Sequence, residues 1–467
     1  MPPKTITEIF NSALTPREQV TALKEKTIMV PSWGGRNGLE AQYNPQKHPV
    51  MDKGKYRDII TEIGVENVTR ITIDLQRLAV KRMTELVCGI PIKRVYKPQN
   101  EKQKQIAEFI ENIFSRNRID SVNIERCNML YAGCEVMTLW YGVSEKNNFY
   151  GFNSPLKLRC RNFSPMLGDE LYPLFDETGD LIALSVGYTR KVERKNISFF
   201  DCYISNRHIT YSNATGDWEI IVDEPITIMK IPGVYMYRST PIYEHCSPIV
   251  YEIEWALSRN GNYLRKNSKP IFAVFADEDV KYGDEKDENE EARAVVQFPA
   301  AGRAEYVTWQ QAVENLKYYV GELRNSFFTQ LQLPDWSYEK MSQQALSGES
   351  RKQLFIDAQL KVKDESGRLL EFFDREVNVI KSFLKIILGE DWAADIDALP
   401  VEIIITPFSI TDEKDTISNL VNATGGKAII SQREAIEMLG WSTDVDKTLN
   451  EIAKEEMNDI MGGQSYQ

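Results

Sequence analysis

Apolar residues recur at helical spacing toward the C-terminal end of the chain. One series covers residues 308–331, and a second continues from 347 until Gly389. We therefore expect two helices, the second about 60 Å long, because each helical residue adds about 1.5 Å. Pro334 lacks the amide hydrogen that a continuing helix needs, so we expect residues 332–346 to form a loop between them.

Helical periodicity also marks shorter segments. The predicted helices cover residues 63–88, 103–116, 119–131 and 248–267. Two further helices are predicted from their caps. Thr15 precedes a proline at the first position of a helix over 16–26, and Ser431 with Glu434 forms a capping box.

Extended segments separate these helices. Between residues 134 and 236, short β-branched and aromatic runs alternate with turn sequences about every ten residues, which is typical of an antiparallel meander. Strands are also expected at 271–275, 294–298 and 401–406. An acidic loop, residues 277–291, lies between the first two. The expected fold class is α+β, predominantly α-helical.

Length and composition limit the possible classes of protein. A chain of 467 residues is too long to form a single ordinary hydrophobic core, and about three folded units are expected. We find no apolar run long enough for a membrane span and no signal-peptide pattern, so we expect a protein made inside a cell that does not bind membranes. The six cysteines include no CxxC pair and are expected to be free thiols.

Net charge bears on nucleic acids. A net charge of −12 argues against tight binding, because non-specific affinity comes mainly from Lys and Arg at phosphates. An acidic protein can still surround DNA without gripping it. The charge leaves both possibilities open.

The motifs that would support catalysis are missing. The segment 425–428 resembles a phosphate-binding loop, but position 421 is Val where a glycine is required, and Ala428 replaces the magnesium-binding Ser or Thr. The neighbouring carboxylates of 277–279 point in alternating directions on a strand end and do not converge on a metal. We expect no enzyme activity, no metal site and no cofactor.

Several motifs occur in an order that resembles one known family. A helix ends at a Gly89-x-Pro91 turn within 80–92, and a helix–glycine–strand junction lies at 130–136. The remaining motifs are Ser164-Pro165, 173–176, 425–431, 435–440, 444–446 and 451–456. Together they resemble the portal proteins of tailed bacteriophages, of the long-tailed (siphovirus) type.

That resemblance implies a portal fold that forms a cyclic ring, normally of twelve subunits, through which double-stranded DNA passes without sequence specificity. It implies the following regions: wing 1–237, first stem helix 238–268, clip 269–307, second stem helix 308–331, tunnel loop 332–346, long wing helix 347–400 and crown 401–467. The ring would lie at the portal vertex of the virion capsid after assembly in the host cytoplasm.

The same resemblance implies functional positions. The tunnel loop would line the DNA channel with Lys340, Ser342, Gln343 and Gln344. The basic end of the first stem helix either lines the channel or only offsets the helix macrodipole, and consists of Arg265, Lys266 and Lys269. The clip is either a docking surface or a solvated loop, and its acidic residues are Asp277, Glu278, Asp279, Asp284, Glu285, Asp287 and Glu288.

The partners implied by the resemblance are further copies of the chain, the terminase large subunit, a head-completion or adaptor protein, and the major capsid and scaffolding proteins. Two other functions stay open from the residues alone. One is an oligomeric scaffold or adaptor that does not enclose DNA. The other is an acidic metal-dependent nuclease, for which converging carboxylates would be needed.

Overall fold

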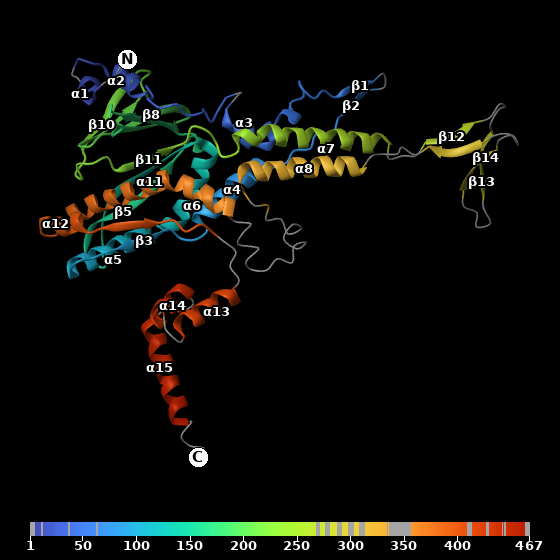
Figure 1. Ribbon diagram of the computed structural model, residues 1–467. Coiled ribbons are helices and arrows are strands. Elements are labelled where there is room, and N and C mark those ends of the chain that lie inside the picture. Colours follow the sequence, from blue (N-terminus) through green and yellow to red (C-terminus); the bar gives the residue numbers. More distant parts are fainter. Residues whose placement is uncertain are drawn as a thin grey trace. The chain divides into compact units, whose positions relative to one another are not determined.

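The computed structural model describes residues 5–10, 13–35, 38–61, 64–267, 271–275, 281–286, 292–297, 303–307, 313–333, 335, 356–408, 413–425, 429–440, 442 and 445–462. The chain forms two compact units (Figure 1). The first contains residues 1–333 and 365–406, and the second contains 334–364 and 407–467. The mixture of helices and sheets confirms the α+β class.

Two antiparallel sheets form the centre of the first unit. The five-stranded sheet has the order β10-β9-β8-β7-β6. Its strands are β6 Glu170–Phe175, β7 Leu181–Val192, β8 Lys195–Tyr203, β9 Arg207–Ser212 and β10 Glu219–Pro225. The three-stranded sheet, of order β11-β4-β5, consists of β4 Glu135–Asn147, β5 Ser154–Phe163 and β11 Gly233–Tyr237.

The expectation of one continuous meander is therefore wrong. The last strand, β11, pairs with β4 and not with β10, with Gly233 opposite Leu139. A side chain at Gly233 would come within 2.8 Å of Leu184 on β7, so the missing side chain allows the two sheets to approach closely there.

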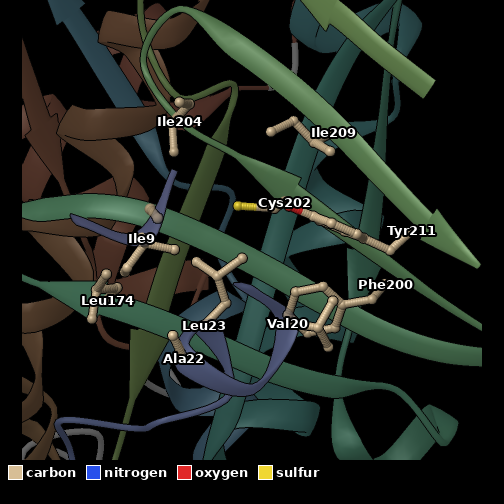
Figure 2. Packing of buried hydrophobic residues seen from close by; sticks show 11 residues of the cluster. Ile9, Val20, Ala22, Leu23, Leu174, Phe200, Cys202, Ile204, Ile209 and Tyr211 are labelled. Carbon is tan, nitrogen blue, oxygen red and sulfur yellow. The ribbon is translucent and has the colours of Figure 1, made fainter. Parts of the chain in front are cut away.

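A hydrophobic cluster lies between the five-stranded sheet and the N-terminal helices α1 Ile6–Ile9 and α2 Pro16–Leu23. Figure 2 shows Val20 and Leu23 of α2 on the side of the sheet that carries Phe200 and Cys202. The predicted Thr15 cap is confirmed, because its side chain accepts from the Glu18 amide in a capping box.

The first unit contains five further helices. They are α4 Leu75–Cys88, α5 Glu101–Arg116, α6 Ile119–Gly133, α11 Ile356–Leu388 and α12 Glu390–Ala398. The predictions of α5 and α6, and of Gly389 as the end of α11, are confirmed. Residues 347–355, the expected start of the long helix, lie outside the described residues.

A buried ion pair joins α6 to α11. The Arg126 guanidinium donates to both carboxylate oxygens of Glu376, at 2.7 and 2.8 Å, and both side chains are almost fully buried. The indole Nε1 of Trp140 on β4 donates to the same carboxylate at 3.0 Å. Three elements of the first unit thus share one buried charge centre.

The helix predicted over 63–88 begins only at Leu75. Residues 64–66 form β2 Gly64–Glu66, which pairs with β1 Ile59–Thr61 in a hairpin. The segment that follows, 67–74, contains no helix or strand. Its β-branched residues fit an extended backbone well, and its amides bond to side chains of a distant helix described below.

Two helices form an arm of the first unit: α7 Ser247–Asn267 and α8 Val313–Leu331 (Figure 1). Both predicted helices are confirmed, although residues 308–312 lie outside the described residues. The strands between them are β12 Ile271–Phe275, β13 Lys281–Lys286, β14 Ala292–Gln297 and β15 Arg303–Val307.

We expected an acidic loop between two strands, 271–275 and 294–298, but the structure has a further strand within that loop. β12 pairs with β15, and β13 pairs with β14. Residues 281–286 of the expected loop are thus a strand. The acidic composition misled the prediction, because Asp284 and Glu285 lie in a strand opposite Ala294 and Arg293.

Short elements complete the first unit. They are α3 Leu39–Tyr43, the 3-10 helices Pro45–Lys47, Pro49–Met51, Pro165–Leu167 and Glu244–Cys246, and the antiparallel pair β3 Lys93–Tyr96 and β16 Val401–Ile404. β16 is the strand predicted at 401–406. All six cysteines are free thiols, as predicted.

The second unit contains α13 Glu413–Thr424, α14 Gln432–Leu439 and α15 Val445–Gly462. The predicted capping box is confirmed, since Ser431 and Glu434 exchange side-chain and backbone hydrogen bonds at the start of α14. The expected tunnel loop falls largely in this unit, and its residues 336–346 lie outside the described residues.

Candidate functional site

The arm is the candidate functional site, because it carries the one predicted channel residue whose side chain the structure describes, Arg265. At the start of α7, Val250, Ile253 and Glu254 are buried against the body of the first unit. Toward its end, Leu264 is 50% exposed. The helix is thus anchored at one end and leaves the body at the other.

A row of side chains on α7 binds the extended segment 67–74. Each bond runs from a backbone amide of the segment to a side-chain oxygen of the helix. The bonds join Ile73 to Glu254, Ile71 to Ser258 and Thr69 to Asn262, at 3.0, 2.9 and 2.5 Å. Four helical residues rise about 6 Å and two extended residues about 6.6 Å, so the spacings match. The helix therefore takes the place of a partner strand.

Glu254 also holds a buried histidine. Its Oε1 lies 2.7 Å from Nδ1 of His48, and the other ring nitrogen, Nε2, lies 2.8 Å from the carbonyl oxygen of Gln42. A carbonyl can only accept, so Nε2 carries hydrogen. Both side chains are fully buried, which makes this contact an internal link and not a surface site.

The base of the β1–β2 hairpin is tied together by Asp58. Its carboxylate accepts from the Val68 amide at 3.0 Å and from the Arg70 guanidinium at 2.9 Å. The Val68 hydrogen bond first, and then Arg70, lower the pKa of Asp58 below its ordinary value. The carboxylate therefore holds both ends of the hairpin at neutral pH.

The same base is packed onto α7. Tyr56 lies edge-on to Trp255, with ring centroids 4.7 Å apart, and its hydroxyl accepts from the Asn262 side chain. Near the end of the helix, Arg265 donates to the carbonyl oxygen of Asn67 at 3.3 Å. The hairpin is thus held along the C-terminal half of α7.

α8 contacts α7 on another side of that helix. The Tyr319 hydroxyl donates to Glu252 at 3.2 Å. Desolvation and then this hydrogen bond raise the pKa of Tyr319. Glu252 lies about 200° around the helix from Glu254, since successive residues turn by about 100°. The segment 67–74 and α8 therefore occupy different faces of α7.

The predicted functional residues fall into three groups. Arg265 lies on the arm, where it binds Asn67. Lys266, Asp284 and Glu285 lie in α7 and β13, but their side chains are outside the described part of the chain. The others are outside it altogether: Lys269, Asp277, Glu278, Asp279, Asp287, Glu288, Lys340, Ser342, Gln343 and Gln344. Their roles stay predictions.

Sequence reasoning missed the row formed by Glu254, Ser258 and Asn262. The signal was present, because three polar residues four apart place one polar stripe on a helix that is otherwise apolar at its start. On the extended segment 67–74, which binds this stripe, the corresponding signal was the run of β-branched residues before Leu75. Neither signal alone identifies the other segment.

A cleft and the clusters of titratable side chains are the other candidate sites among the described residues. A cleft of about 780 Å³ lies among Lys26, Tyr235, Arg368, Glu371 and neighbouring side chains, and its charges are of both signs. No group of three or more His, Cys, Asp or Glu side chains among the described residues is placed to hold a metal ion. Within the same residues, every helix is too short or too polar to cross a membrane.

Comparison with known proteins gives a match over most of the chain. A family model described as "Phage portal protein, SPP1 Gp6-like" matches residues 40–461. No curated protein matches the chain. Solved structures with similar chains include "Neck of empty GTA particle computed with C6 symmetry", at 8% identity and a TM-score of 0.38, covering 86% of this chain and 95% of that one. "Virion of native gene transfer agent (GTA) particle" has 9% identity and a TM-score of 0.40, covering 92% and 99%.

Proposed function

Because this chain belongs to the phage portal protein family of the SPP1 Gp6-like type, we propose that its copies form a closed ring, a DNA channel at one capsid vertex. The genome would be packaged through this channel by the terminase motor and later ejected through it. The family match over residues 40–461 carries the proposal.

The arm supports a ring for a physical reason. Two paired helices cannot enclose an apolar core by themselves, and the outer part of this arm leaves large apolar side chains in solvent. Identical neighbours in a head-to-tail ring would bury such surfaces without any other protein. We assign α7 and α8 to the stem of the ring, 269–307 to the clip and 401–467 to the crown.

The charge of the chain suits a channel through which DNA slides. A net charge of −12 on each subunit, repeated around a ring, repels the phosphates and keeps the duplex from binding the wall tightly. In the tunnel loop, Lys340, Ser342, Gln343 and Gln344 would touch phosphates mainly through uncharged groups. Arg265, Lys266 and Lys269 would make brief contacts where the stem meets the clip.

The clip would dock other proteins. We assign the acidic residues between Asp277 and Glu288 to the surface that meets the terminase large subunit and, later, a head-completion or adaptor protein. The wing, 1–237 and 347–400, would face the major capsid and scaffolding proteins. The assembled ring would belong to the virion, after assembly in the host cytoplasm.

Electron microscopy of the purified full chain tests the ring. Negative-stain images should show closed rings with a central opening wide enough for a DNA duplex. Assemblies without a central opening would favour the alternative, an oligomeric scaffold or adaptor that does not enclose DNA. A chain that remains monomeric at every concentration would contradict the proposal.

The tunnel-loop assignment has its own test. Replacing Gln343 and Gln344 by Lys should reduce DNA filling of capsids, because added cations grip the phosphates, while ring assembly stays intact. The matched control replaces both by Asn, which keeps the loop neutral and should fill normally. Normal filling with the Lys variant would remove the assignment.

A further inference from the structure

Two cysteines from distant parts of the chain meet inside the first unit. Cys88 is the last residue of α4, and Cys127 lies within α6, 39 positions later. Their Sγ atoms lie 3.3 Å apart, where one thiol donates a hydrogen bond to the other. Cys127 is fully buried and Cys88 is 7% exposed. We call these two residues the thiol pair.

The packing of α4 against α6 fixes the thiol pair. Thr84 lies one turn before Cys88, and its hydroxyl donates to the side-chain oxygen of Asn128 at 3.1 Å. Asn128 directly follows Cys127, so contacts one helical turn apart set how the two helices face each other. A cysteine sulfur moves about a single side-chain torsion, so helices fixed in this way also keep the two sulfurs together.

A small movement brings the two sulfurs to bonding distance. A disulfide bond is about 2.0 Å long, so the gap has to close by about 1.3 Å. The movement falls at the end of a helix, because α4 stops at Cys88, and helix ends fray more easily than helix centres. The pair can therefore close while the centres of α4 and α6 stay folded.

The same surroundings protect the pair from rapid reaction. The hydrogen bond with Cys127 first, and then burial, raise the pKa of the Cys88 thiol. A cysteine reacts as its thiolate, which is therefore scarce at neutral pH. A reagent also has to wait for the end of α4 to open, because Cys127 is fully buried. Oxidation of the pair is therefore slow, and it begins at Cys88, the more exposed of the two.

We propose that Cys88 and Cys127 are a redox site at which a small-molecule disulfide converts the thiol pair into a Cys88–Cys127 disulfide. The thiolate of Cys88 attacks one sulfur of the small disulfide, whose S–S bond breaks and releases one small thiolate. Cys127, as its thiolate, then attacks the Cys88 sulfur, which forms the protein disulfide and releases the second small thiolate. The two protein sulfurs lose two electrons to the small disulfide, and the two cysteine protons pass through solvent to the small thiolates.

The disulfide would lock α4 to α6. A bond between residues 39 positions apart removes freedom from the unfolded chain, and this stabilises the folded state. The locked helix α6 also carries Arg126, which binds Glu376 of α11. Small thiols keep such a pair reduced in the cytosol, whereas it oxidises where those thiols are absent. The proposal concerns one copy of the chain and does not depend on the ring.

Thiol counting on the folded full chain tests the site. The purified chain is incubated with oxidised glutathione without denaturant, and the remaining thiols are then blocked with N-ethylmaleimide in denaturant. Intact-mass spectrometry should show six blocked thiols before oxidation and four after it, because two of the six have joined. Fragmentation of the linked peptides should place the bond between Cys88 and Cys127.

Matched variants separate this pair from the other cysteines. Cys88→Ser and Cys127→Ser should each keep all five of their remaining thiols after oxidation, whereas Cys160→Ser should still lose two. The wild-type count decides the question even where a Ser variant fails to fold. Six blocked thiols after prolonged incubation, a persistent glutathione adduct, or a bond between any other two cysteines would overturn the proposal.

Thermal unfolding tests the lock itself. The oxidised chain should unfold at a midpoint at least about 3 °C above that of the reduced chain, because the bond closes a long loop. Cys88→Ser should give the same midpoint before and after incubation with oxidised glutathione. An oxidised wild-type chain that unfolds at or below the midpoint of the reduced chain would refute the lock between α4 and α6.

Discussion

The body and the arm of the first unit are stabilised in different ways. The body buries large apolar side chains between sheets and helices, and it also buries the Arg126–Glu376 ion pair. The arm is anchored by buried side chains at the start of α7 and by hydrogen bonds that the amides of an extended segment donate to α7, and it leaves Ile60, Val65 and Tyr318 in solvent. The difference is that packing against an apolar core holds the body, whereas the outer part of the arm depends more on hydrogen bonds.

The strongest test of this difference removes the buried charge pair. Glu376→Ala leaves the Arg126 guanidinium buried without its partner, which should destabilise the body by about 3–5 kcal/mol. Urea unfolding followed by tryptophan fluorescence measures the loss. The control, Glu371→Ala on the same helix, breaks an exposed pair with Arg375 and should cost less than about 1 kcal/mol. Equal losses would mean that the pair does not hold the body together.

A smaller effect is expected where α7 binds the extended segment 67–74. Ser258→Ala leaves the partly buried Ile71 amide without its acceptor, at a cost of about 1–3 kcal/mol. Hydrogen exchange should speed up in peptides covering 67–74. Ser115→Ala, at an exposed serine of α5, should change stability by less than about 0.5 kcal/mol. Unchanged exchange in 67–74 would show that the row of side chains is dispensable.

The N-terminal cap of α2 should have a still smaller effect. Thr15→Ala removes the oxygen that accepts from the Glu18 amide, and should cost about 1 kcal/mol by chemical denaturation. Thr21→Ala, at an exposed threonine of the same helix, is the matched control and should change stability by a few tenths of a kcal/mol. A Thr15 loss no larger than the Thr21 loss would contradict the role of the cap.

The smallest effect concerns pH and the hairpin base. The pKa of Asp58 is lowered in the folded chain, so its contribution is complete above the unfolded-state pKa of about 3.9 and is lost as pH falls through the folded value. Pepsin should therefore cut the hairpin faster as the pH falls below that range. In Asp58→Asn, the hairpin should be cut at a rate that varies no more with pH than cutting elsewhere in the chain. An unchanged pH response in that variant would exclude Asp58 as its cause.

Local signals in the sequence predicted much of the fold. The caps at Thr15 and Ser431 and the stop at Gly389 are properties of a few adjacent residues, and all three are found in the structure. The arm helices, α7 and α8, were predicted from periodicity because each is long enough for the pattern to repeat.

Distant contacts decided where prediction failed. The segment before Leu75 fits a helical pattern, but amides such as that of Ile71 bond to side chains of α7, including Ser258, far along the chain. β11 likewise pairs with β4, and Gly233 allows it to pack closely on Leu184 of the other sheet, a contact far from it in the sequence. At the candidate site, contacts between distant parts of the chain likewise could not be predicted from local sequence. Arg265 was recognised by its charge, but its bond to Asn67 depends on the folded hairpin.

Hydrogen exchange on separated subunits and assembled rings tests most directly whether neighbouring copies complete the arm. Peptides covering β1, β2 and α8 should become at least tenfold more protected in the ring, because their exposed faces are then covered. Peptides from the body strand β8 and from α6 should exchange equally in both states. Rings in which the hairpin and α8 exchange as fast as in the free subunit would contradict the account.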